Sequence, residues 1–162
     1  MYRKGDKVVY PHHGAAVIED LVEREILGER RTYFKLRLTH GDLTLMVPVD
    51  NTEEVGIRGV VSKREVKKVL EVLREDDEPA STANWSRRFK LNVEKLKSGD
   101  IYQVAEVVRS LSVRERDRGL SAGEKRMLAK ARQILVSELT FAYESTEEQT
   151  EAMLDKVLQE AR

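Results

Sequence analysis

The chain has no cysteine, and this absence excludes disulfides, thiol nucleophiles, iron–sulfur clusters and zinc sites built from cysteine ligands. No run comes close to the roughly 18 apolar residues that a transmembrane helix needs. No hydrophobic signal-peptide region follows Met1. We therefore expect a cytoplasmic protein that does not enter a membrane, whose 162 residues form one domain or two small ones.

Histidine is also scarce, and the three in the chain are His12, His13 and His40. His12 and His13 could offer two metal ligands, but a zinc site needs three or four. We therefore expect their imidazoles to satisfy hydrogen bonds in a turn, with no metal and no cofactor. The carboxylates lie in charged helix and turn sequences, and none has an apolar setting that would raise its pKa. The sequence thus predicts that the protein is not an enzyme.

The segment 119–125, GLSAGEK, resembles a phosphate loop but lacks the spacing G-x-x-x-x-G-K-[ST], and it follows a predicted helix rather than a strand. Free backbone N–H groups at the next helix start, with Lys125 and Arg126 in its first turn, could still hold one phosphate of a nucleic acid. Cations at a helix N-terminus oppose the macrodipole and need another reason to be there. The alternative is a solvated basic turn.

Charge is spread unevenly, although the formal net charge is +0. Residues 1–80 carry a net −2, residues 81–132 a net +7 and residues 133–162 a net −5. A strongly basic block inside a neutral chain makes nucleic acid the first partner to consider. The acidic last segment can be a solvated helix face.

The first ~58 residues predict β structure, because short alternating segments are separated by turn residues. Phe34, Leu36 and Leu38 share one face of a strand, and Leu43, Leu45 and Val47 share a face of the next, which leaves Met46 outside. This pattern predicts a small, strongly bent antiparallel barrel of SH3 or Tudor type. The expected strands are 7–10, 15–26, 32–38, 43–48 and a short one at 54–57.

The rest of the chain predicts helices whose first and last residues are indicated by capping residues. Capping boxes, in which the two side chains cap each other's backbone N–H, are expected at Ser62–Glu65, Ser121–Glu124 and Ser145–Glu148. Asp100 is expected to cap another helix that Gly119 ends. We therefore expect an α+β protein of two domains, a β domain at 1–60 and an all-α domain at 61–162, with helix 62–74 and linker 76–82 between them. Further helices are expected from about 84 to 98, from 101 to 118, from 122 and from 146 onward.

The basic residues of the second domain fall into two groups. Arg87, Arg88 and Lys90 surround Trp85, the only tryptophan, and a basic platform with an aromatic wedge suits minor-groove binding. Trp85 also shares a helical stripe with Phe89, Val93 and Leu96, so it can equally be a core residue. In the second group, Arg126, Lys130 and Gln133 share a helix face, with Lys125 and Arg132 beside it.

Three motifs together resemble one known family. They are GDKVVYPHHG at 5–14, NWSRR at 84–88 and RGLSAGEKRMLAKAR at 118–132. They strongly resemble the CarD family of bacterial transcription regulators, in its short form, over essentially the whole chain. The first ~60 residues also resemble the polymerase-binding module of transcription-repair coupling factors.

The resemblance implies a division of labour between the two domains. A Tudor-like domain would pair an exposed strand edge with the β subunit of RNA polymerase, with Arg24 at that interface. The helical domain would contact promoter DNA at the upstream edge of the transcription bubble, where Trp85 wedges into the minor groove. Many relatives carry arginine where this chain has Met46, which affects the charged part of the polymerase contact. The DNA-facing residues implied are Trp85, Arg88, Lys90, Lys125 and Arg126. The pattern of basic residues adds Arg87 and Lys130 to the expected DNA-binding set.

The sequence therefore predicts a non-enzymatic regulator, monomeric and held at the nucleoid through polymerase. It would bridge RNA polymerase and promoter DNA and stabilise the open complex with little sequence specificity. The alternative is a protein-only adaptor whose basic helices dock an acidic partner. Salt-dependent binding to duplex or forked DNA separates the two hypotheses.

Overall fold

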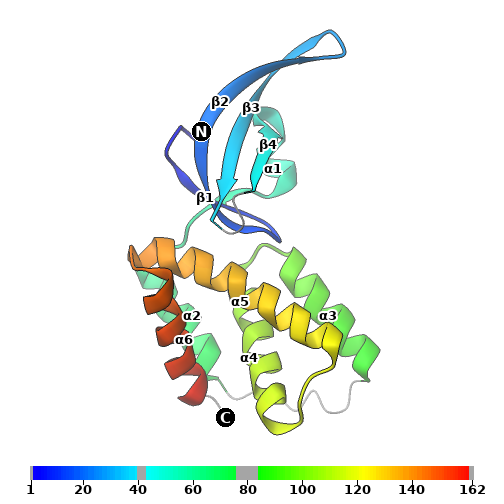
Figure 1. Cartoon of the computed structure of the whole chain (residues 1–162), viewed down its shortest axis with the longest axis vertical. Helices are drawn as coiled ribbons and strands as arrows, with labels where there is room; N and C mark the ends of the chain where they lie inside the picture. Colours follow the sequence, from blue (N-terminus) through cyan, green and yellow to red (C-terminus); the bar gives the residue numbers. More distant parts are fainter. Residues whose placement is uncertain (1, 40–42, 76–83, 161–162) are drawn as a thin grey trace.

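The computed structural model describes residues 2–39, 43–75 and 84–160, so the expected linker 76–82 lies outside the described residues. A β module at the N-terminal end stands on a bundle of helices (Figure 1). Five strands form one antiparallel sheet in the order β4-β3-β2-β1-β5. They are β1 (Lys7–Tyr10), β2 (Gly14–Ile26), β3 (Glu29–Leu38), β4 (Thr44–Pro48) and β5 (Arg58–Gly59). The α+β class and the antiparallel sheet expected from the sequence are confirmed.

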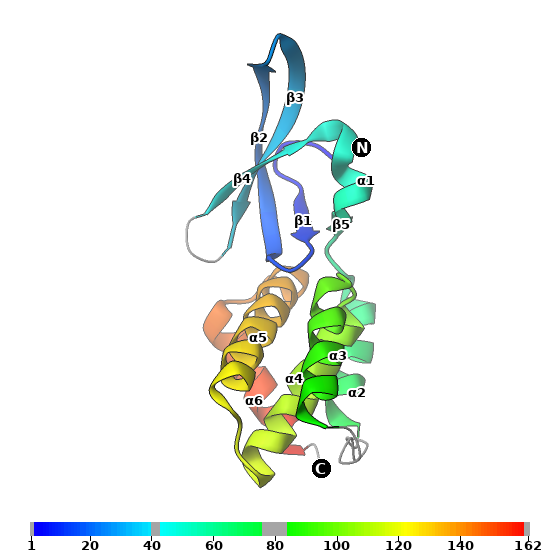
Figure 2. The ribbon, with the colours of Figure 1, turned by 90° about the vertical axis from the view of Figure 1, so that its right-hand side faces the viewer.

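The sheet has one buried face, which follows from the alternation of apolar residues along its strands. Phe34, Leu36 and Leu38 are buried together with Val47 of β4, as their spacing predicts. The long hairpin of β2 and β3 extends beyond this core (Figures 1 and 2). Its two turn residues, Leu27 and Gly28, both have positive φ, which is the backbone of a tight hairpin turn.

Two expectations in the β module are wrong. The segment expected as a strand at 54–57 contains a helical turn, α1 (Thr52–Val55), preceded by a short 3-10 helix at Val49–Asn51. Two acidic residues in its first turn and Gly56 in the left-handed conformation at its end favour the helix. Leu43 precedes β4 and is 47% exposed, so it does not join Leu45 and Val47 on the buried face.

Five longer helices form the second module. They are α2 (Lys63–Arg74), α3 (Trp85–Lys97), α4 (Ile101–Asp117), α5 (Ala122–Tyr143) and α6 (Glu147–Glu160). The capping boxes at Ser62–Glu65 and Ser121–Glu124 are confirmed. Asp100 accepts a hydrogen bond from the backbone N–H of Tyr102, and Gly119 follows α4 with φ +81°.

The last capping box is shifted by one residue from its expected place. Thr146 and Gln149, rather than Ser145 and Glu148, exchange hydrogen bonds at the start of α6. Ser145 instead bonds the hydroxyl of Thr150 inside the bend between α5 and α6. The apolar stripes of α2, α4, α5 and α6 meet in one core, which contains Val69, Val108, Leu135 and Leu154.

The two modules meet where β2 and the β1–β2 turn contact the second half of α5. The backbone N–H of Ala15 donates to Ser137 Oγ at 2.9 Å. Gly14 has φ +87°, and a Cβ there would lie 2.7 Å from the same oxygen, so only glycine fits without a shift. Lys7 Nζ lies 5.1 Å from the centre of the Phe141 ring. These contacts fix how the β module stands on the helices.

Candidate nucleic-acid interface

Trp85 begins α3, and its side chain is 45% exposed. Asn84 caps the helix by accepting a hydrogen bond from the backbone N–H of Arg87. The indole stacks on the Phe89 ring with centroids 5.0 Å apart and an interplanar angle of 20°. Of the stripe seen in the sequence, Leu96 is buried, but Trp85 at its other end is not. Trp85 is therefore an exposed residue whose indole packs on the Phe89 ring, and not the core residue that its helical spacing also allowed.

Helices α3 and α5 lie side by side, both with their N-terminal ends directed away from the β module (Figure 2). At that end the Phe89 ring lies 3.5 Å from where a Cβ on Gly123 would be, which is van der Waals distance, so α3 and α5 touch there. This contact places the stacked pair of aromatic rings beside the first turn of α5.

Four cations lie along the adjoining flanks of these two helices, and we name them the cationic strip: Lys90, Lys97, Arg126 and Lys130. Lys90 and Lys97 are seven residues apart on α3, and Arg126 and Lys130 are four apart on α5, so each pair shares a helix face. Lys90 and Lys97 each follow a residue of the buried stripe, Phe89 and Leu96, and are turned by about 100° from it. Trp85, the first residue of α3, lies at the same end of the two helices as Arg126.

The pairing of cations on α3 and α5 differs between the strip and the other flanks. Lys95 pairs with Glu106 of α4 at 3.0 Å, and Arg132 pairs with Glu151 and Asp155 of α6 at 2.6 and 2.7 Å. Within the described part of the chain, none of the four strip cations has a carboxylate within ion-pair distance. Lys95 and Arg132 are thus neutralised by neighbouring helices, whereas the described residues leave the strip open to a partner outside the chain.

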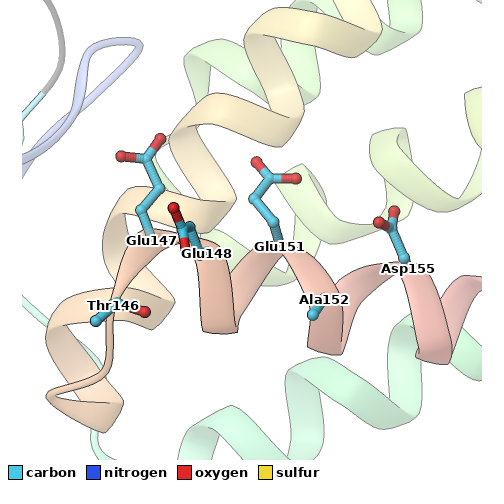
Figure 3. A pocket seen from close by; sticks show the side chains of 6 residues that line it. All are labelled: Thr146, Glu147, Glu148, Glu151, Ala152 and Asp155. Carbon is cyan, nitrogen blue, oxygen red and sulfur yellow. The ribbon is translucent and has the colours of Figure 1, made fainter.

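Acidic groups gather away from the strip. Figure 3 shows Glu147, Glu148, Glu151 and Asp155 along one side of α6. Helix α6 lies on the other side of the bundle from α3 (Figure 1). The acidic residues of α6 therefore lie on another side of the helical module than the strip.

The remaining basic residues named from the sequence do not all belong to the strip. Arg87 is exposed in the first turn of α3. Lys125 is exposed but lies five residues before Lys130, about 140° away around α5. Arg88 is half-buried and two residues before Lys90, on the opposite flank of α3. Arg132, expected beside the basic face, is turned to α6.

Lys97 and the position of the turn at His12 and His13 are not predicted from the sequence. Burial and the charges of Lys130 and Lys97 lower the pKa of His12. Burial, Lys130 and His12 lower the pKa of His13. The seven-residue spacing from Lys90 could have identified Lys97, but no local signal shows that the β1–β2 turn lies next to α5.

The β module brings Arg24 and Met46 to one face of the sheet. Met46 is opposite Lys35 in the register of β3 and β4, and Arg24 is opposite Arg31 in the register of β2 and β3. Because Arg31 and Lys35 are four residues apart on β3, their side chains point to the same side. Met46 is 39% exposed, as its strand position predicts, and β4 forms one edge of the sheet.

Comparison with known proteins decides the family. A family model described as CarD, C-terminal domain, matches residues 68–155, and one described as CarD-like/TRCF RID domain matches residues 2–61. The chain belongs to the CarD family. A Bacillus subtilis (strain 168) protein named "Putative transcription factor YdeB" is 36% identical over 149 residues, which cover 92% of this chain and 97% of that protein.

Solved structures of CarD-type N-terminal domains are also similar to part of the chain. The structure titled "CdnLNt" from Myxococcus xanthus is 28% identical, has a TM-score of 0.34 and covers 39% of this chain and 89% of that one. The 72-residue N-terminal domain of Myxococcus xanthus CarD is 27% identical, has a TM-score of 0.32 and covers 36% of this chain and 79% of that one. CarD-like proteins are of the transcription factor type, and family membership places this chain in transcription regulation.

Two further observations concern the described residues. They contain no helix long and apolar enough to span a membrane. They also contain no group of three or more His, Asp or Glu side chains that could hold a metal ion.

Proposed function

We propose that this CarD-family protein binds the RNA polymerase β subunit through residues 1–60 and promoter DNA through residues 61–162, and stabilises the open promoter complex. The observation that carries the proposal is the exposed Trp85 beside a strip of cations for which the described residues offer no carboxylate partner. Two separate apolar cores, one in each module, support the division of the chain between two partners.

The DNA contact follows from the chemistry of the strip. Its lysines and arginine suit phosphates, which position a protein on DNA without reading its sequence. The Trp85 ring offers an apolar face to a base step that is opening, and the Phe89 ring behind it keeps its orientation. An aromatic residue gains about 1–3 kcal/mol from stacking on a base. Because a base face is open to the ring only where its neighbouring base has unstacked, this contact favours DNA at the edge of a melted region.

Stabilisation of the open complex then follows from differential affinity. A ligand that binds the open state better than the closed state shifts the equilibrium by the difference in binding free energy. A difference of about 1.4 kcal/mol shifts it tenfold. The polymerase contact through the β4 edge, Arg24 and Met46 would hold the helical module at the site where the bubble begins.

The test is binding of the full chain to a forked duplex, measured by fluorescence anisotropy at several salt concentrations. The protein should bind, with log affinity falling linearly against log salt concentration. Replacing Lys90 and Arg126 with glutamine should lower that slope by about two. The matched control replaces Lys67 and Lys68, two exposed lysines of α2, and should leave the slope unchanged.

The protein-only adaptor remains the second hypothesis, because an acidic protein could also occupy the strip. It predicts no salt-dependent binding of the forked duplex by the wild-type chain. That result would contradict the DNA contact proposed here.

A further inference from the structure

The end of the cationic strip formed by Lys97 and Lys130 lies next to the β module, where the β1–β2 turn, α3 and α5 meet. His12 in the β1–β2 turn, Leu96 of α3 and Ile134 of α5 line one small cavity between the modules. Lys97 is the residue after Leu96, and Lys130 is one helical turn before Ile134. We name His12, His13, Lys97 and Lys130 the junction cluster.

Lys97 and Lys130 supply the positive charge of the junction cluster, since the lowered pKa values of His12 and His13 keep these imidazoles neutral at neutral pH. Besides burial, the charges of Lys130 and Lys97 lower the pKa of His12, and those of Lys130 and His12 lower the pKa of His13. These effects require the four side chains to lie near one another. Among the described residues, neither lysine is within ion-pair distance of a carboxylate. Glu138, which lines the same cavity as His12, is paired with Arg58, with two N–O distances of 2.7 Å. The charges of Lys97 and Lys130 repel each other, and a bound anion would relieve that repulsion.

The β1–β2 turn also holds the side chains of His12 and His13 in defined positions. His12 has φ 71°, a left-handed conformation that non-glycine residues rarely adopt. The His13 ring is held edge-on by Tyr10, with centroids 5.1 Å apart, and by His12 at 5.8 Å. His12 remains exposed on its outer side. Backbone strain of this kind concentrates at binding sites, where surrounding contacts maintain it.

We propose that the junction cluster is a second phosphate-binding site for the nucleic acid, built jointly by the β module and the helical module. This inference rests on the proposed function, since the same DNA would have to occupy both ends of the strip. The helix dipole favours a cation at Lys97, because this residue lies in the last turn of α3. Lys130 lies in the middle of α5, where the helix dipole does not favour a cation.

The geometry gives the distance between the two contacts. Trp85 and Lys97 are the first and last residues of α3, about 18 Å apart along the helix axis at 1.5 Å per residue. Duplex DNA rises about 3.4 Å per base pair, so this length spans about five base pairs. The cluster would thus hold a backbone phosphate about five base pairs from the step at Trp85, on the duplex side of the fork. A nucleic acid bound there touches both modules at once.

The experiment uses the full chain and a forked duplex whose paired arm is 15 base pairs long. Lys97→Gln, and separately His12→Gln with His13→Gln, should weaken binding, and Lys97→Gln should lower the salt slope by about one. Lys67→Gln, which removes one exposed charge from α2, is the control. The Lys97 side chain is exposed and has no hydrogen bond or ion pair with the described residues, so Lys97→Gln should leave the fold unchanged.

A second measurement places the contact on the DNA. Neutral methylphosphonates are introduced about five base pairs from the fork. Wild type should lose affinity for this DNA, and Lys97→Gln should lose little more, because the same contact is already absent.

Two outcomes would overturn the inference. If the Lys97→Gln slope equals that of Lys67→Gln while wild type binds the fork, the junction site is wrong and the proposed function stands. If wild type shows no salt-dependent binding at all, both fail.

Discussion

Arg58 and Glu138 join the two modules through a two-point ion pair, with Nη1–Oε2 and Nη2–Oε1 both at 2.7 Å. Glu138 is 1% exposed, and its Oε2 also accepts a hydrogen bond from the backbone N–H of Val61. The Arg58 Nε donates to the carbonyl oxygen of Gly99 at 2.8 Å. Burial alone would lower the pKa of Arg58, but hydrogen bonds and charge from Glu138 outweigh it and raise that pKa. One ion pair therefore ties β5, α5 and the α3–α4 turn together.

The first prediction concerns this ion pair. Glu138→Gln should lower the free energy of unfolding by about 3 kcal/mol, because it leaves Arg58 partly buried without its carboxylate. Thermal unfolding followed by circular dichroism should show a fall in Tm of about 6–12 °C for a chain of this size. The double variant Arg58→Gln with Glu138→Gln should recover part of the loss. A single variant as stable as wild type would show that the pair does not hold the modules together.

The second prediction concerns pH. Since the pKa values of His12 and His13 are lowered in the folded protein, the unfolded chain takes up their protons first as the pH falls. The histidines therefore cost no stability above the unfolded value near 6.5, and stability should fall as the pH drops below it. Wild type should lose more Tm between pH 7.5 and 5.5 than His12→Gln with His13→Gln.

Lys130→Gln provides the check on the cause of this pH dependence. It removes the charge that acts on both histidines, so the loss of Tm at low pH should shrink. If all three proteins lose the same Tm, the histidines do not contribute.

The third prediction concerns Met46 on the β4 edge. Met46→Arg adds a cation beside Lys35 on the exposed face of the sheet and should tighten binding to the polymerase β subunit by about two- to tenfold, if that face meets acidic groups. Arg24→Glu should weaken the same binding. Surface plasmon resonance with immobilised polymerase measures both. Leu91→Arg adds the same charge to an exposed site on α3 and should leave polymerase affinity unchanged.

The parts of this structure that the sequence predicts are those set by local patterns. Ser62 and Ser121 each precede a glutamate by three residues, and this spacing alone locates two helix starts. Phe34, Leu36 and Leu38 alternate, and the alternation alone identifies the buried face of β3. At Thr146 the local signal was ambiguous, since Ser145 and Glu148 offer the same spacing one residue earlier.

The junction could not be predicted in this way, because its partners are far apart along the chain. Arg58 and Glu138 are separated by 80 residues, and Ala15 and Ser137 by 122. The exposure of Trp85 also depended on packing, since its helical spacing fits a core position equally well. The basic residues could be named from the sequence, but which of them have carboxylate partners depends on how α4 and α6 pack.

The central claim is that the exposed Trp85 ring stabilises melted promoter DNA while the β module holds polymerase. The direct measurement is the lifetime of the heparin-resistant open complex formed by purified polymerase with the full-length protein. Trp85→Ala should shorten that lifetime about five- to a hundredfold, toward the value without the protein, and leave polymerase affinity unchanged. Leu91→Ala, which removes an exposed apolar side chain from the same helix, should keep the wild-type lifetime. A folded Trp85→Ala protein with the wild-type lifetime would contradict the account.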